Sequence, residues 1–323
     1  MQKNNAALKP IGGYLELELP TGNEYYPNLI QLNTGRNALE YILKQKRYSK
    51  IYIPYFTCDA LLEPIKKLEI KHQFYSIDEK FDPIINFEIE QYAGFLYTNY
   101  FGIKQEKVIE LSNQIKNLII DNSQAFFSEP LPGVDTFYSC RKFFGVSDGA
   151  YLQIKKKLPK KLPVDISVNR FSHLIKSIEF GVEGGYQDYQ TNNKDLENNE
   201  IRSMSKLTQR ILSSINYDEC AGKRERNFNF LHKHLAEFNL LKFNVPKNCA
   251  PMVYPFLSND SHLKVHLIQK KIFVATYWPN VFKWTKKGMY ENYLARCLVP
   301  FPIDQRYSLQ DMFHMLNILR HFV

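Results

Sequence analysis

Short apolar runs alternate with helix-like stretches between Asn33 and Ile154. The runs that read as strands are 51–53, 72–77, 94–97 and 117–121, and the stretches with apolar residues three or four positions apart are 37–46, 59–68 and 105–115. Strands that alternate with helices form parallel sheets covered on both faces, so the pattern predicts an α/β chain with a mostly parallel sheet between helical layers. In such sheets ligands bind at the carboxyl ends of the strands.

The pattern of apolar and polar positions is different in the remaining part of the chain. Residues 181–200 are polar and contain glycine, which predicts a loop or a boundary between two lobes. A helical pattern covers 203–240, strand-like runs follow at 250–257 and 272–278, and a closing helix is predicted at 308–322. We therefore expect a large domain at 1–180 and a smaller α+β domain at 181–323.

Composition and net charge indicate which kinds of molecule the chain could bind. The 323 residues are 44% hydrophobic and 23% charged, as in ordinary folded proteins. The net charge of +9 suits an anionic partner, such as nucleic acid, a membrane surface or a phosphorylated small molecule. Because the basic residues are scattered, we favour the small molecule over nucleic acid.

Cysteines and apolar runs exclude other classes. The five cysteines are widely spaced and form no CxxC pair, so neither a disulfide framework nor a zinc site is indicated. No apolar run approaches the roughly 20 residues that span a bilayer. Residues 1–10 lack the apolar core of an export signal, and we expect a cytoplasmic location without membrane contact.

The first segment with candidate chemistry is Asn33-Thr34-Gly35-Arg36, a short turn that enters a helix. Free backbone N–H groups and the helix dipole at such a turn favour a phosphate. The alternative is ordinary capping of the helix by Asn33 or Thr34.

The second segment is Asp121, directly after a buried strand. A carboxylate there could hold a ring nitrogen of a bound group in its protonated form. The alternative is an aspartate that only caps the next turn.

The third segment places Lys142 beside Arg141 and before Phe143-Phe144, with Asp148-Gly149 further on. An apolar setting and a neighbouring cation should both lower the pKa of this lysine and favour the free amine that a Schiff base needs. The alternative is a surface lysine whose stem lies over aromatic rings.

The order of these segments resembles fold-type-I pyridoxal phosphate (PLP) enzymes, most closely the sugar aminotransferases of the DegT/DnrJ/EryC1/StrS family. The matching stretches are Thr34-Gly35-Arg36, 54–58, 99–102, Asp121-Asn122-Ser123-Gln124, 137–149, 204–207 and 298–307. The resemblance covers nearly the whole chain. It implies the three-layer αβα PLP-transferase fold, with a smaller C-terminal lobe.

The resemblance also implies roles for individual residues. Lys142 would be the Schiff-base lysine and the base of the proton shift, Asp121 would pair with the pyridine nitrogen, and Gln124 would contact the phenolic oxygen. Gly35 and Arg36 would bind phosphate through their backbone N–H groups. The cofactor-binding set becomes Thr34, Gly35, Arg36, Cys58, Asn99, Asp121, Gln124, Ser139 and Lys142, with no metal.

Three positions depart from the family pattern. The serine that binds phosphate falls at Phe137, for which Ser139 is a substitute. The aromatic residue that stacks on the cofactor falls at Cys58, so Phe56, Tyr55 or Asn99 would have to take that place. The asparagine that reaches the partner's phosphate is missing, and Arg202 is the candidate replacement.

Other signals are weaker. His262 and His266 have a metal-compatible spacing but no intervening glutamate. Cys58 and Cys140 are conceivable nucleophiles without a local signature. Trp278 and Trp284 lie near lysines and fit lobe packing better than stacking on a substrate base.

The resemblance therefore predicts a homodimeric PLP-dependent aminotransferase. Its amino donor would be glutamate, its acceptor a keto-sugar attached to a nucleotide, and its product a precursor of surface polysaccharide. One alternative is a PLP-dependent lyase or dehydratase on the same fold, although dehydratases of this family replace the lysine by histidine. The other is a degenerate member that binds a sugar nucleotide without turnover.

Overall fold

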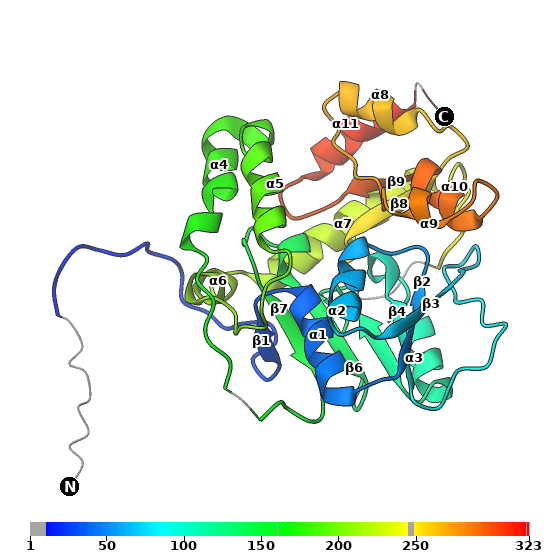
Figure 1. Cartoon of the computed structure of the whole chain (residues 1–323). Helices are drawn as coiled ribbons and strands as arrows, with labels where there is room; N and C mark the ends of the chain where they lie inside the picture. The colour runs from blue at the N-terminus through cyan, green and yellow to red at the C-terminus, as the bar shows by residue number, and fades with distance from the viewer. Residues whose placement is uncertain (1–10, 160, 245–248, 321, 323) are drawn as a thin grey trace, which may run out of the picture.

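A computed structural model describes residues 11–159, 161–244, 249–320 and 322 of the chain (Figure 1). The prediction about an export signal in residues 1–10 falls outside these residues. No helix in the described ranges is both long and apolar enough to cross a membrane.

Within the described residues, seven strands form the central sheet in the order β1-β7-β6-β5-β4-β2-β3. The five strands from β6 to β3 are parallel, whereas β7 runs antiparallel to both β6 and β1. The predicted α/β class with a mostly parallel sheet is confirmed. The bounds are β1 Ile30–Leu32, β2 Lys50–Pro54, β3 Lys71–Tyr75, β4 Ala93–Thr98, β5 Leu118–Asp121, β6 Asp135–Ser139 and β7 Ala150–Gln153.

Side-chain alternation along the strands produces two cores, one on each face of the sheet. In β5, Ile119 packs beneath α1 and α2, while Ile120 joins the aromatic core on the opposite face. Both faces are apolar because helices cover both, as a buried parallel sheet requires. The helices of this half are α1 Gly35–Lys46, α2 Leu62–Lys67 and α3 Gln105–Gln114.

A second sheet pairs β8 (Val253–Leu257) with β9 (Leu298–Pro302) in antiparallel register. The long helix α7 (Tyr217–Leu235) packs against β8 and against the closing helix α11 (Leu309–Leu319). Between these elements lie α8 Leu263–Gln269, α9 Val281–Trp284 and α10 Tyr290–Cys297. Of these elements, α7, β8 and α11 lie where the sequence predicted a helical pattern, a strand and a closing helix, whereas β9, α9 and α10 were not predicted.

Two predictions about local structure are wrong. Residues 181–200 are mostly helical, because α4 (Ser172–Gly184) and α5 (Tyr186–Asp195) form a hairpin that projects from the sheet in Figure 1. Residues 272–278 pair with no strand of the described chain, although Ile272, Val274 and Trp278 are buried. An apolar run reports burial, and periodicity alone does not distinguish a strand from an irregular buried segment.

The division at 180/181 stays a prediction. Helix α4 runs across this position, so a boundary placed there would cut the helix.

A buried arginine ties the C-terminal elements to the turn after β6. The side chain of Arg224 on α7 is 1% exposed and donates to the carbonyls of Pro251, Met252 and Phe143 at 3.2, 3.1 and 3.3 Å. Gln305 accepts from its Nε and donates to the same Phe143 carbonyl. One guanidinium thus holds the residue next to Lys142 against the second sheet.

Arg224→Leu should lower the free energy of unfolding by about 3 kcal/mol, because three buried carbonyls lose a charged donor. Arg226→Leu, two residues away on the same helix but exposed, should change it by less than about 0.5 kcal/mol. Urea denaturation of both variants measures the difference. Equal losses would show that the buried hydrogen bonds do not hold the two parts together.

Candidate active site

A cavity of about 360 Å³ opens at the carboxyl ends of the parallel strands. Sites for small ligands and cofactors are typically about 300–1,000 Å³. Eight of the nine residues that we predicted to bind the cofactor line this cavity: Thr34, Gly35, Arg36, Cys58, Asp121, Gln124, Ser139 and Lys142.

The N-terminus of α1 forms one wall. Thr34 caps the helix, since its Oγ1 accepts from the N–H of Asn37 at 3.1 Å. Both interpretations of this turn are therefore compatible, because the capping residue also faces the cavity. The Ser139 side chain lies close by, its Cβ 3.9 Å from where a Cβ on Gly35 would stand. Free N–H groups and a hydroxyl thus meet at one point of the wall, as anion binding requires.

Asp121 ends β5 beside Thr98 of β4 and Phe137 of β6. Its Oδ1 accepts from the N–H of Ser123 at 2.8 Å. Burial raises the pKa of Asp121 above its ordinary value, while the charge of Lys142 and the hydrogen bonds of Ser123 oppose this rise. A buried carboxylate that faces a cavity and has one backbone donor is able to accept a further proton donor from a ligand.

Gln124 holds the neighbouring turn and presents its amide to the cavity. Its Oε1 accepts from the N–H of Phe101 at 3.0 Å, which leaves the NH₂ group as the end able to donate to a ligand. Asn99, in contrast, does not line the cavity: its Nδ2 donates to Gln105 at 3.0 Å and its Oδ1 accepts from the N–H of Lys104. The structure gives Asn99 a role in shaping the turn.

Lys142 ends the 3-10 turn η3 (Cys140–Lys142) that follows β6. Its Nζ donates to Oγ of Ser123 at 3.2 Å. Phe143 and Phe144, the aromatic residues that follow it, turn into the core and pack on Phe126. Lys142 is exposed in the single chain, so its amine is accessible from the cavity.

None of the three residues proposed to replace the stacking aromatic lines the cavity. Tyr55 stacks on Phe74 at 4.7 Å, and Phe56 is buried against Trp278. Trp278 itself reaches the cavity wall, which lobe packing alone did not predict. It is therefore a wall residue as well as a packing residue.

Helix α5 supplies a wall that the sequence did not indicate. Tyr189, Asn193 and Leu196 line the cavity, and Arg141 meets them from the η3 turn. Asn193 and Leu196 follow Tyr189 by four and seven positions, which places the three residues on one helical face. This periodicity is the sequence signal that could have predicted a helix here. The polar residues around them obscured it.

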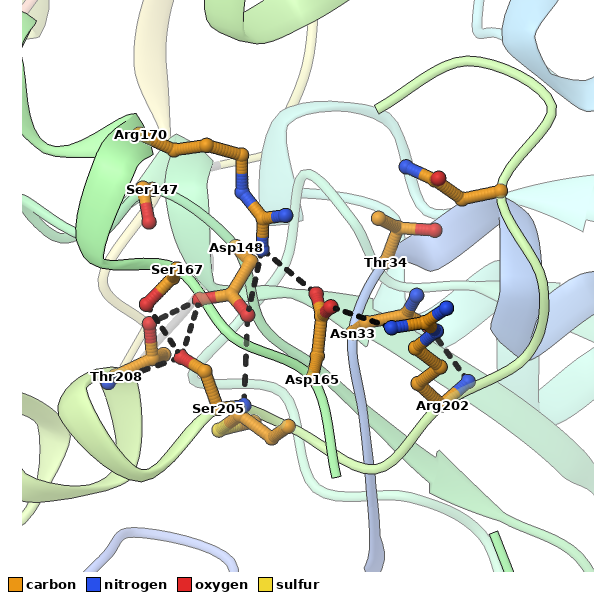
Figure 2. A network of polar contacts seen from close by, with 12 residues as sticks. Asn33, Thr34, Ser147, Asp148, Asp165, Ser167, Arg170, Arg202, Ser205 and Thr208 are labelled. Carbon is orange, nitrogen blue, oxygen red and sulfur yellow. Dashed lines mark hydrogen bonds and ion pairs between the residues drawn. The ribbon is translucent and has the colours of Figure 1, made fainter. Parts of the chain in front are cut away.

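Figure 2 shows a polar network centred on Asp148, the residue before Gly149 of the cavity wall. Asp148 is fully buried, and its carboxylate accepts from the hydroxyls of Thr208 and Ser205 and lies 3.5 Å from the Arg170 guanidinium. Ser205 caps α6 (Lys206–Leu212). The Asp148-Gly149 and Met204-Ser205 stretches, distant in sequence, are thus one unit that supports the cavity.

Arg202 does not line the cavity. Its side chain is 42% exposed, with Nη1 3.9 Å from Oδ1 of Asp165 (Figure 2). Within the single chain this side chain is directed to a carboxylate.

The weaker candidates do not converge on a site. Among the described residues no group of three His, Cys, Asp or Glu side chains is arranged to hold a metal ion. Burial raises the pKa of Cys58 and of Cys140, which disfavours the thiolate that a nucleophile needs.

Comparison with known proteins identifies the fold. No family model matches the chain, and no curated protein matches its sequence. Solved structures do match: DesV of S. venezuelae, in complex with a ketimine intermediate, has a TM-score of 0.65 at 14% identity, covering 91% of this chain and 84% of its own. The chain therefore has the fold of this structure.

Two further structures agree. NtdA from Bacillus subtilis, with bound cofactor PMP, matches with a TM-score of 0.65 at 14% identity over 91% of this chain and 72% of its own. A DegT DnrJ EryC1 StrS aminotransferase from Brucella abortus matches with a TM-score of 0.58 at 13% identity over 91% and 85%. The fold implied by the sequence resemblance is confirmed.

Asp121→Asn should leave the cofactor-free chain at least as stable as the wild type at pH 7.5. The folded-state pKa of Asp121 is raised, so ionisation costs folding free energy at pH values above the unfolded pKa of about 3.9. The advantage of the variant should shrink as the pH falls toward about 4, where an unfolded aspartate becomes neutral. Urea denaturation at several pH values measures it.

Asp304→Asn is the control with the opposite sign. Burial alone would raise the pKa of Asp304, but the hydrogen bond and charge of Arg306 lower it overall. This variant should lose stability at pH 7.5, and the loss should diminish as the pH falls through the lowered pKa. An Asp121→Asn variant that behaves like Asp304→Asn would assign Asp121 a structural role.

Proposed function

We propose that the chain is a PLP-dependent aminotransferase that transfers an amino group, with glutamate as donor, to a keto-sugar attached to a nucleotide. The observation that supports this most directly is the convergence of Asp121, Gln124, Lys142 and the α1 N-terminus on one cavity. These residues lie on separate strands and turns, and folding alone does not require them to meet at one cavity.

The residues present fit the cofactor. A buried carboxylate suits a pyridinium nitrogen, the Gln124 amide suits a phenolic oxygen, and the N–H groups of Gly35 and Arg36 suit a phosphate. Lys142 supplies the amine to which PLP would attach. Cys58 is small where the family has an aromatic residue, and Trp278 provides an aromatic wall instead.

When bound, PLP would supply the electron sink that makes the C–H bond of the amino donor acidic. Asp121 would stay ionised beside the ring nitrogen of the cofactor and would keep that nitrogen protonated. Lys142, whose amine is held 3.2 Å from Ser123, would then be the base that takes and returns the proton.

The acceptor assignment rests on the sequence resemblance and on the cavity wall. Trp278 and Tyr189 offer aromatic faces on which a sugar or a base can pack. The net charge of +9 suits a diphosphate-linked substrate. We infer that the product enters surface polysaccharide synthesis in the cytoplasm.

Purified protein reconstituted with PLP should absorb at about 400–430 nm, as expected for cofactor attached to a lysine. Glutamate should remove this band, and a nucleotide-linked keto-sugar should restore it. A band that glutamate leaves unchanged would contradict an aminotransferase that uses this donor, while the absence of any band would favour a chain without turnover.

Borohydride reduction followed by peptide mapping should place the pyridoxyl group on Lys142. Lys50, a lysine engaged with Glu90 at the start of β2, is the internal reference and should stay unmodified. An adduct on another lysine would overturn the assignment of Lys142.

We also propose that the enzyme is a homodimer, with α4 of each chain at the interface. Ile178 and Phe180 on α4 are 83% and 73% exposed, and Ile175 and Tyr186 add to this apolar surface. A second chain seated on the hairpin would cover these side chains close to the cavity residues of α5.

Ile178→Asp should convert the dimer to a monomer, because a buried charge opposes association. The control is Ile109→Asp, a half-exposed isoleucine on α3. Light scattering after size exclusion gives both masses. A wild-type monomer with intact cofactor would refute the dimer, and an unaffected Ile178→Asp dimer would place the interface elsewhere.

A further inference from the structure

Arg141 lines the cavity, but none of the roles proposed above involves it. It precedes Lys142 in the η3 turn and lines the same cavity. Its Nη2 donates to Oδ1 of Asn193 at 2.6 Å, and its guanidinium lies 6.0 Å from the centre of the Tyr189 ring. Two residues of α5 therefore hold this side chain in one orientation.

Arg141 differs from Arg36 and Arg170 in having no carboxylate within ion-pair distance among the described residues. Arg36 pairs with Glu63 at 3.3 Å, and Arg170 pairs with Asp165 at 2.6 Å. Arg141 forms no ion pair among the described residues, and its Nε is buried without a hydrogen-bond partner there. A buried cationic donor that lacks an acceptor is costly unless a ligand supplies one.

The surroundings of Arg141 favour an anion. Burial lowers its pKa, and the charges of Arg36 and Arg170 lower it further, against opposing contributions from Tyr189 and Asp148. Ser139, two residues earlier, lies at the α1 N-terminus, where the helix dipole is positive. Two guanidiniums, a helix N-terminus and a hydroxyl thus face one cavity, whose carboxylate, Asp121, ends the neighbouring strand β5.

We propose that Arg141 binds the phosphate of the cofactor from within the same chain, together with Ser139 and the α1 N-terminus. This rests on the proposed PLP function. It replaces the cross-subunit contact predicted for Arg202, whose side chain is directed to Asp165. A guanidinium suits a phosphate dianion because it donates two hydrogen bonds in one plane.

The α4–α5 hairpin acquires a role from this assignment. Asn193 accepts from Nη2 of the guanidinium, and no described residue accepts from its Nε or Nη1. Asn193 is then a positioning residue, and Asn193→Ala should weaken phosphate binding less than removal of Arg141 does.

The test compares PLP with pyridoxal, which has the same ring but no phosphate. Arg141→Gln should weaken PLP binding about ten- to a hundredfold, as for the loss of a charge-assisted hydrogen bond, while pyridoxal affinity should change less than about twofold. Arg141→Lys should restore part of the loss, since it keeps the charge without the fork. Arg226→Gln, an exposed arginine on α7, is the matched control. Absorbance titration measures all four proteins.

Other outcomes would overturn the assignment. Equal weakening of PLP and pyridoxal would mean that Arg141 supports the cavity in general. Unchanged PLP affinity with weaker glutamate binding would assign Arg141 to the donor carboxylate. A loss of PLP affinity in Arg202→Gln, with Arg141→Gln unaffected, would restore the cross-subunit contact.

Inorganic phosphate separates this inference from the proposed function. If the wild type binds no PLP, the proposed function is refuted. The anion site at Arg141 is then tested separately, by measuring whether phosphate raises the melting temperature of the cofactor-free chain. Stabilisation that disappears in Arg141→Gln but persists in Arg226→Gln would support the anion site. If phosphate does not stabilise the wild type, the site is refuted. Should Arg141→Gln not fold, phosphate binding by Arg141→Lys against the wild type decides the same question.

Discussion

The parallel register of the central strands is the constraint on which the rest of this structure depends. Parallel pairing aligns the carboxyl ends of β2, β4, β5 and β6 at one edge, so the residues that follow them meet there. Asp121 lies beside Thr98 and Phe137 solely through this register. A shift by one residue would turn Asp121 to the opposite face of the sheet, because side chains alternate along a strand.

The cost of this arrangement is a set of polar groups held away from water. Asp121 and Asp148 are both buried, and burial raises the pKa of each. Their surroundings differ in a way that fits different roles. Asp148 is surrounded by donors from Ser205, Thr208 and Arg170, so its acceptor capacity is used within the chain. Asp121 has one backbone donor and faces a cavity.

The C-terminal elements are attached to the site through a few buried contacts. Arg224 and Gln305 both bind the Phe143 carbonyl, directly after Lys142. Glu291 on α10 accepts from the N–H of Ile77, just beyond β3. The position of the lysine turn thus depends on helices more than 80 residues away in sequence, as the Arg224 contact with Phe143 illustrates. Rigid support of this kind is what a site needs if its groups are to stay in register.

What the sequence determined by itself was local or dictated by strand order. Alternating strand and helix patterns predicted the sheet, and Thr34, Asp121, Gln124 and Lys142 were identified because each follows or begins a regular element in a recognisable motif. Strand ends converge in any parallel sheet, so positions in the chain were sufficient to place these residues together.

Only the tertiary structure decided the remainder. Tyr189 and Asn193 reach the cavity through a helical hairpin whose polar sequence resembled a loop, and the two helices of this hairpin pack against each other, a contact that the local pattern does not encode. Asn99, Phe56 and Arg202 have suitable side chains but point elsewhere, and side-chain direction is set by contacts that sequence spacing does not encode. Arg141 was visible as a charge beside Lys142, yet whether that charge has a carboxylate partner depends on which distant segments pack around it.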